Sequence, residues 1–324
     1  MLKAKTIHID LHLPKSWNQC TTDELEMIAA AIIAEQQRVG RYHPFDWSRV
    51  KLDVVLAVNN LHVVRNGRNV EDSENRNTEE DDAADGVWIV SRSKEEGDFP
   101  ISTGQLLSLT EMLSWLDDEK SDKTIFMFPY PEITIEAKEQ NERKDGGSKF
   151  FTLHSSLSTL QGPPPLLDGY TWREYRWLTD WMQEYMRRTN ANLDATSAQR
   201  EFLAVLFKPA PVVSGSPADV TADLFAGFSP VRWQVILFWW SSLMAQLAKK
   251  FPKVFKPQPV GKKQRRPQKD TPWDFYNRVT ATIQKYIGGL SEQDVNNATY
   301  GTILQQLEMM ADEAAEMEKL KHKK

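Results

Sequence analysis

The sequence predicts a mainly α-helical protein, with a helical C-terminal two-thirds and a smaller mixed α+β region at the N-terminus. Three observations favour this fold class. Apolar residues recur every three to four positions through most of the chain after residue 169, which is the period of an amphipathic helix. Alternating stretches, typical of strands, occur in residues 1–137. The 324 residues are 40% hydrophobic and 26% charged, as in globular proteins.

The N-terminal region, residues 1–137, is expected to combine strands and helices. Residues 1–13 alternate apolar and polar side chains, as a half-buried strand does. A helix should follow, because Thr21 and Glu24 have capping-box spacing, and Gly40 should end it. The next expected elements are a helix (or a buried strand) at 48–64, a strand at 86–91, a helix at 102–116, and short strands at 124–128 and 133–137.

Three polar or proline-containing stretches divide the chain. Residues 66–86 form an acidic loop with almost no apolar side chain. Residues 138–168 are interpreted as a linker, because they join a charged, glycine-containing stretch to a run of prolines. The predicted parts are therefore the region 1–137, the linker 138–168, a tryptophan-rich helical domain 169–255, a basic linker 256–271 and a C-terminal helical segment 272–324.

Five helices are expected in the C-terminal part of the chain. Thr171 is a suitable N-cap for the first, and Pro230 lies where proline favours the start of a helix. Gly288 and Gly289 separate the last two. The predicted ranges are 171–188, 196–207, 231–250, 272–287 and 299–319.

Tryptophan is concentrated in the block 169–255, which holds six of the eleven tryptophans. One stripe of the helix 171–188 carries Trp177 and Trp181, and the helix 231–250 carries Trp239, Trp240 and Leu243. Both helices are apolar on more than one face, which indicates burial in a helical core. The alternative is a face that binds another hydrophobic helix, because Trp, Tyr and Met are common interface anchors.

The last helix has a seam of apolar residues. Tyr300, Ile303, Leu307 and Met310 follow the alternating three- and four-residue spacing of a coiled coil. Two interpretations remain open. The seam packs against its own domain, or it pairs with a partner protein or with a second copy of the chain.

Motifs that carry chemistry are absent from the sequence. There is no glycine-rich phosphate loop, no G-x-S-x-G nucleophile elbow and no H-E-x-x-H metal motif. Cys20 is the only cysteine, so no intramolecular disulfide can form. We therefore predict no catalytic residues, no metal site and no cofactor, and we expect that the protein is not an enzyme.

The charge distribution points to one candidate binding segment. The net charge of −5 argues against a chain-wide nucleic-acid binder. Residues 249–269, however, contain nine basic and no acidic residues, including the patch Lys262, Lys263, Arg265 and Arg266. This segment is interpreted as a solvated linker, or as a site for an acidic protein or a nucleic acid. The acidic segment 71–85 of the same chain is one candidate for its partner.

A membrane location is not expected. The apolar run between Arg232 and Lys249 is about 16 residues long, shorter than the roughly 20 residues that span a bilayer. The first residues lack the continuous apolar core of a signal peptide. A single thiol also fits a reducing compartment. We therefore predict a cytoplasmic protein.

Several short motifs resemble proteins encoded in the tail modules of tailed phages and prophages. They are His12-Leu13-Pro14-Lys15-Ser16-Trp17-Asn18, Gly169-Tyr170-Thr171-Trp172-Arg173-Glu174-Tyr175, Phe202-Leu203-Ala204-Val205-Leu206-Phe207-Lys208-Pro209, Phe251-Pro252-Lys253-Val254-Phe255 and a terminal helix with Tyr300, Leu304, Leu307 and Glu308. They occur in the same order as in those proteins and are scattered over most of the chain, but they are short and none of them carries chemistry.

The resemblance implies a protein of tail morphogenesis, specifically a tail assembly chaperone. Such a chaperone keeps the long tape-measure protein soluble while the tail tube polymerises around it. The implied partner is thus a hydrophobic helical protein, with self-association as a second interaction. One alternative is a permanent structural subunit of the virion. Another is a protein that binds a nucleic acid or an acidic partner through residues 249–269.

Overall fold

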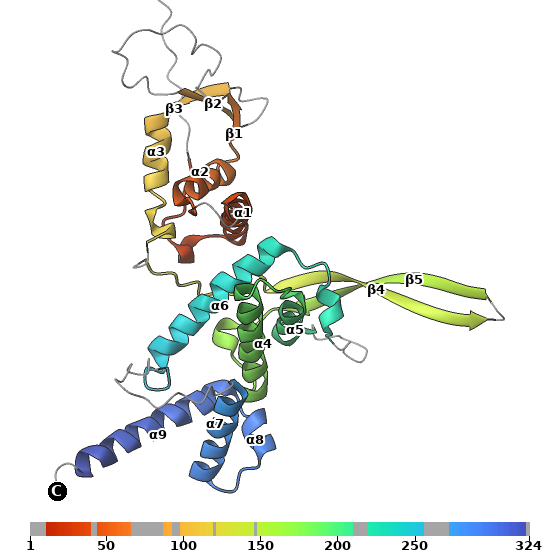
Figure 1. The fold of residues 1–324 in the computed structure, drawn as a ribbon, viewed down its shortest axis with the longest axis vertical. Coiled ribbons are helices and arrows are strands. Elements are labelled where there is room, and N and C mark those ends of the chain that lie inside the picture. The colour runs from red at the N-terminus through yellow and green to blue at the C-terminus, as the bar shows by residue number, and fades with distance from the viewer. Residues whose placement is uncertain are drawn as a thin grey trace, which may run out of the picture. The chain divides into compact units, whose positions relative to one another are not determined.

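The structure is a computed structural model of the chain, and it describes residues 11–39, 44–65, 87–92, 98–118, 121–145, 148–209, 220–255 and 272–321. The chain divides into two compact units (Figure 1). The first comprises Met1–Ile125 with Pro230–Phe238, and the second comprises Phe126–Ser229 with Trp239–Lys324. The helix α6 (Pro230–Lys250) is continuous and contributes to both units.

The first unit begins with two helices that start at side-chain caps. In α1 (Thr22–Val39), the N–H of Glu24 donates to Thr21 Oγ1 at 3.2 Å, and the N–H of Thr21 donates to Glu24 Oε2 at 2.7 Å. The predicted capping box and the helix that follows it are confirmed. In α2 (Trp47–Val58), Asp46 Oδ1 accepts the N–H of Ser48 at 3.0 Å. Residues 48–64 are therefore a helix in their first part and a strand at their end.

A small sheet completes the first unit. The strands β1 (His62–Arg65), β2 (Val87–Ser91) and β3 (Asp98–Ser102) are antiparallel in that order, and α3 (Thr103–Glu111) follows β3 directly. A short 3₁₀ helix covers Ser114–Leu116. The apolar side chains that join the sheet to the helices are Leu61, Val90, Phe99, Ile101 and Leu106. The predicted strand 86–91 is confirmed, and the predicted helix 102–116 is split into these two helices.

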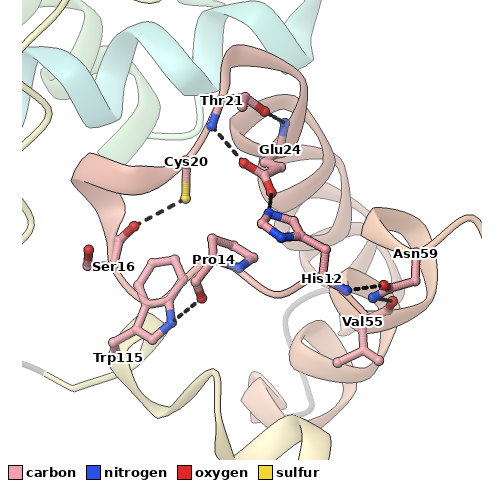
Figure 2. Close-up of polar contacts among 9 residues, drawn as sticks. All are labelled: His12, Pro14, Ser16, Cys20, Thr21, Glu24, Val55, Asn59 and Trp115. Carbon is pink, nitrogen blue, oxygen red and sulfur yellow. Dashed lines mark hydrogen bonds and ion pairs between the residues drawn. The ribbon is translucent and has the colours of Figure 1, made fainter. Parts of the chain in front are cut away.

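The first of the short sequence motifs, residues 12–18, makes contacts that stabilise the fold of the first unit. Figure 2 shows Pro14 O accepting the indole N–H of Trp115 at 3.1 Å, and the N–H of His12 donating to Asn59 Oδ1 at 2.7 Å. Trp17, in the 3₁₀ helix Trp17–Gln19, is buried with its ring edge-on to Trp115, at 5.3 Å between ring centroids. These contacts fasten residues 12–17 to α2 and to the chain after α3.

The second unit opens with a long antiparallel hairpin. The strands β4 (Glu132–Asp145) and β5 (Ser148–Gln161) pair along their whole length, from Glu132↔Gln161 to Asp145↔Ser148 (Figure 1). The two-residue strand β6 (Lys208–Pro209) pairs with the end of β5. A Cβ on Gly162, just after β5, would lie 2.3 Å from Tyr130 O, so the chain passes too close there for any side chain.

The middle of the second unit is helical. It contains α4 (Trp172–Asn190), α5 (Thr196–Leu206), the 3₁₀ helices Pro165–Leu167 and Ala222–Phe225, and the second part of α6. Phe128 packs edge-on against Trp239, with 4.7 Å between centroids, and Phe202 packs edge-on against Trp240, with 5.2 Å. The aromatic residues of α6 thus lie in the core, as the burial interpretation predicted.

The C-terminal helices pack on the start of α4. They are α7 (Pro272–Ile287), α8 (Glu292–Asn297) and α9 (Tyr300–Lys321), and α8 has no counterpart in the sequence prediction. The Tyr175 and Tyr300 rings stack at 4.9 Å. The buried Arg176 donates to Asn296 Oδ1 at 3.2 Å and to Asn277 Oδ1 at 3.3 Å. One cation thereby connects α4 to α7 and α8.

The predicted distribution of the secondary structure is wrong, although the protein is broadly mainly α. Helices occur throughout the chain, because α1, α2 and α3 precede residue 112, and the mixed α/β region lies around residues 60–135. The predicted linker 138–168 contains most of β4 and β5 instead of irregular chain. The second part of β4 is almost entirely charged or polar, so it lacks the alternating apolar pattern by which a strand is recognised. Residues 124–128, predicted as a strand, form none.

Three predicted segments lie wholly or mostly outside the described residues. The strand predicted at 1–13 lies almost entirely outside the described residues, as do the acidic loop 66–86 and the basic linker 256–271. The predicted domain boundaries stay a prediction. In the described part of the chain, no helix is both long and apolar enough to span a bilayer.

Candidate binding site

The second unit holds a cavity between α4 and α5, and the start of α4 determines which side chains line it. The N–H of Glu174 donates to Thr171 Oγ1 at 3.2 Å, and the N–H of Thr171 donates to Glu174 Oε2 at 2.7 Å. This capping box satisfies two backbone donors that a helix start leaves unpaired. It therefore fixes the first turn of α4, as the sequence predicted with Thr171 as N-cap.

Two stripes of α4 face different surroundings. The first is buried and consists of Trp172, Tyr175, Leu178 and Met182. The second lines the cavity and consists of Glu174, Trp177, Trp181 and Glu184. Residues three and four apart share one face of a helix, so the second stripe presents two indole rings between two carboxylates.

The opposite wall of the cavity comes from α5 and the strand after it. Its residues are Glu201, Ala204, Val205, Phe207, Lys208 and Pro209. The cavity volume is about 850 Å³, within the range of roughly 300–1,000 Å³ that is typical of ligand pockets. Trp177 is 46% exposed, and Trp181 is half-buried. Aromatic surface is therefore accessible at this site.

Two of the four carboxylates are paired with cations of the same unit. Lys208 Nζ lies 3.1 Å from Glu174 Oε1 and 3.9 Å from the ring centroid of Tyr170. Glu184 accepts hydrogen bonds from Arg187 Nε and Arg188 Nε, both at 2.7 Å. These two arginines lower the pKa of Glu184 to about 2. The charges of Glu174 and Glu184 are thus balanced by ion pairs within the second unit.

Asp180 and Glu201 are different. Within the described residues, neither carboxylate forms an ion pair, and the buried Oδ1 of Asp180 accepts no hydrogen bond. Burial raises the pKa of Asp180, and the nearby charge of Arg176 opposes this only in part. A buried acceptor without a donor costs free energy, which adds to the cost of the partly buried charge on Asp180.

The titratable side chains of the cavity lining are four carboxylates and one lysine. Across the described ranges, no three His, Cys, Asp or Glu side chains are grouped so that they could hold a metal ion. What the cavity offers is indole surface, aliphatic side chains and negative charge.

The structure separates the aromatic and apolar residues that were predicted to bind a partner. Trp239, Trp240 and Leu243 are buried in the core, with Trp239 only 1% exposed. Tyr300 and Ile303 are also buried, which favours the interpretation that the start of the last helix packs on its own domain. These five side chains are covered by the fold in this conformation.

The remaining predicted residues are accessible to different degrees. Leu307 and Met310 are half-buried on α9, beyond the part of the seam that is covered. Trp177 and Trp181 line the same cavity. The site is therefore smaller than the predicted set of residues and is centred on α4.

Of the basic segment 249–269, the structure describes residues 249–255. Lys249 and Lys250 are exposed at the end of α6, and Lys253 forms an ion pair with Asp312 of α9. The N–H groups of Lys253 and Val254 both donate to Glu308, at 3.1 Å. Lys262, Lys263, Arg265 and Arg266 lie outside the described residues.

Sequence reasoning missed the half of the site that α5 supplies. Glu201, Ala204, Val205 and Lys208 follow three- and four-residue spacing, so their common face could be recognised in the sequence. The sequence does not indicate that this face lies opposite Trp177 and Trp181. Asp180 was also missed, because its burial depends on tertiary packing.

The first unit has a smaller cavity of about 570 Å³ between α2, α3 and the sheet. Its lining includes Arg49, Asp53, Trp88 and Leu107. Burial raises the pKa of Asp53, and Arg49 counteracts that effect. The indole N–H of Trp88 already donates to Thr103 Oγ1 at 3.2 Å, so the ring is held in the wall.

Comparisons of the chain with models of protein families, with curated proteins and with solved structures find no match.

Proposed function

We propose that the protein is a non-enzymatic assembly protein that binds a hydrophobic helix of a partner protein in the cavity between α4 and α5. The biological setting we propose is the morphogenesis of a phage or prophage tail. There the protein acts as a tail assembly chaperone in the host cytoplasm, and its partner is a tape-measure-like helical protein.

The observation that carries the proposal is the exposure of Trp177 in the wall of the cavity. Large aromatic side chains are costly to leave in water, and in binding sites they contribute a large share of the affinity. Trp181, Val205 and Ala204 extend the apolar surface around it. A helix that places one or two apolar side chains in this cavity would bury that surface.

The tail setting rests on the order of the short motifs described in the sequence. Two of these motifs supply residues of the cavity, since Glu174 belongs to the motif 169–175, and Ala204, Val205 and Lys208 belong to the motif 202–209. This overlap supports an interpretation of these motifs as parts of a partner-binding region. Other parts of the motifs, such as Trp17, have a structural role.

A co-purification experiment tests the proposal. The full chain is co-expressed with the tape-measure-like protein encoded nearest to its gene, and the complex is captured through a tag on that protein. Trp177→Ala with Trp181→Ala should abolish co-purification, because both indole rings are removed from the cavity. Trp47→Ala is the matched control, since Trp47 is a half-buried tryptophan of the first unit outside both described cavities.

Circular dichroism shows whether the double variant is folded. A folded double variant that still co-purified like the control would contradict the proposal. Mass spectrometry of purified virions then separates the chaperone from the structural alternative. A chaperone should be absent from finished particles, whereas a structural subunit should be present in a fixed ratio to the other tail proteins.

A further inference from the structure

The α4–α5 cavity is lined by more carboxylates than cationic groups. Among its lining residues are four carboxylates and one ammonium group, on Lys208. Glu174 is paired with Lys208, and Glu184 is paired with Arg187 and Arg188. Asp180 and Glu201 are left with no ion-pair partner in the part of the chain that the structure describes.

Arg176, whose charge acts on Asp180, already donates hydrogen bonds to other residues. Arg176 lies one helical turn before Asp180, but its two Nη atoms donate to Asn296 and Asn277. Its charge compensates for only part of the burial of Asp180. A cationic ligand in the cavity would therefore be attracted to a carboxylate that the described residues leave without an ion pair.

The aromatic wall selects among cations. A guanidinium group is planar, stacks on an indole ring and can donate two parallel hydrogen bonds to a carboxylate. An ammonium group has no such flat face and holds its water more strongly. The carboxylates also disfavour an acidic partner segment, because like charges repel in a partly buried site.

We propose that the cavity recognises an arginine side chain on the partner helix, with the guanidinium group against Trp177 and Trp181 and within reach of Asp180 and Glu201. The apolar side chains of the same helix contact Ala204 and Val205. This inference rests on the proposed function, since it names the side chain by which the partner is recognised.

The test uses the full chain and two designed peptides. One is an amphipathic helical peptide of leucine and alanine with two arginines, and its twin carries citrulline, the uncharged isostere, at both positions. Fluorescence anisotropy at low ionic strength should show that the arginine peptide binds at least about tenfold more tightly. Asp180→Asn with Glu201→Gln should remove that difference and leave binding of the citrulline peptide unchanged.

The control variant is Asp168→Asn with Glu316→Gln. It removes one exposed Asp and one exposed Glu of the same unit that do not line the cavity. It should bind both peptides like the native protein. Equal weakening by this variant would overturn the inference, because the effect would then be one of net charge alone.

The outcomes separate this inference from the proposed function. Equal affinity for both peptides, with loss of binding only in Trp177→Ala with Trp181→Ala, overturns arginine recognition and leaves apolar helix binding intact. Binding that is insensitive to the tryptophan substitutions overturns both. The absence of any binding up to about 1 mM peptide also overturns both, since such a cavity should give at least that affinity.

Discussion

Asp180 shows how a single binding residue can lower the stability of the fold that holds it. Its Oδ1 is buried without a hydrogen-bond donor from the described residues, and burial outweighs the attraction of Arg176. The raised pKa means that the folded state favours the protonated form. Ionisation of Asp180 at neutral pH therefore reduces the free energy of unfolding.

We predict that Asp180→Asn is more stable than the native protein at pH 7, because the amide removes the buried charge. The sign follows from the direction of the shift. A carboxyl group with a raised pKa in the folded state destabilises the fold when the pH exceeds that pKa, and it stops doing so as the pH falls through it. Urea unfolding at pH 7 and at acid pH measures both effects. A gain of the same size at both pH values would contradict this assignment.

Arg176 has the opposite role, because it is a buried charge whose partners are all in place. Arg176 is 5% exposed, and its guanidinium group donates hydrogen bonds to amide oxygens of α7 and α8. Arg176→Met keeps most of the side-chain length but leaves two acceptors unpaired. We expect a loss of about 2–3 kcal/mol in the free energy of unfolding, the usual size for hydrogen bonds to a charged group.

Denaturant unfolding of Arg176→Met and of Arg187→Met makes the comparison. Arg187 is mostly exposed and pairs with Glu184 within α4, so its substitution should change stability little. If the two variants lost stability equally, the buried network would not be what joins the C-terminal helices to α4.

At the scale of elements, the chain makes a close approach to itself directly after the β4–β5 hairpin. Gly162 follows β5 at a point where a Cβ would meet Tyr130 O at 2.3 Å and the Phe128 ring at 2.6 Å. The obstacle includes backbone, which cannot move aside as a flexible side chain can. The chain can therefore pass this point only because residue 162 has no side chain.

We predict that Gly162→Ala destabilises the protein by about 1–3 kcal/mol, the usual cost of overpacking. Gly301→Ala is the matched control, because a Cβ there meets nothing within 4 Å and the residue lies inside α9. It should stabilise the protein by about 0.5–1 kcal/mol, since alanine favours a helix over glycine. Thermal unfolding of both variants should give shifts of opposite sign, and shifts of the same sign would contradict the account.

Helix starts could be predicted from the sequence because their causes are local. Thr21 with Glu24 and Thr171 with Glu174 are three residues apart, and both pairs form capping boxes. The β4–β5 hairpin could not be recognised by apolar alternation, since residues 138–149 are mostly charged or polar. Gly146-Gly147 between Asp145 and Ser148 was the available signal, because that dipeptide favours two-residue hairpin turns.

At the scale of the whole molecule, the aromatic residues divide into core and surface. Trp239 and Trp240 hold the second unit together, whereas Trp177 and Trp181 line its cavity. From the sequence, all four tryptophans were candidates both for the core and for a partner-binding face. Helical spacing alone cannot distinguish a face that packs internally from one that remains accessible. A face is buried when another helix of the chain covers it, and the sequence does not show which helix lies opposite.

The placement of a partner helix in the α4–α5 cavity is the central claim, and site-directed photo-crosslinking tests it most directly. A benzophenone-bearing amino acid replaces Val205 in the cavity wall, or Leu107 at the cavity of the first unit, in the full chain co-expressed with the tape-measure-like protein. We predict a covalent adduct of the two proteins from position 205 and none from position 107. An adduct from position 107 alone would contradict the account, because the partner would then bind at the other cavity.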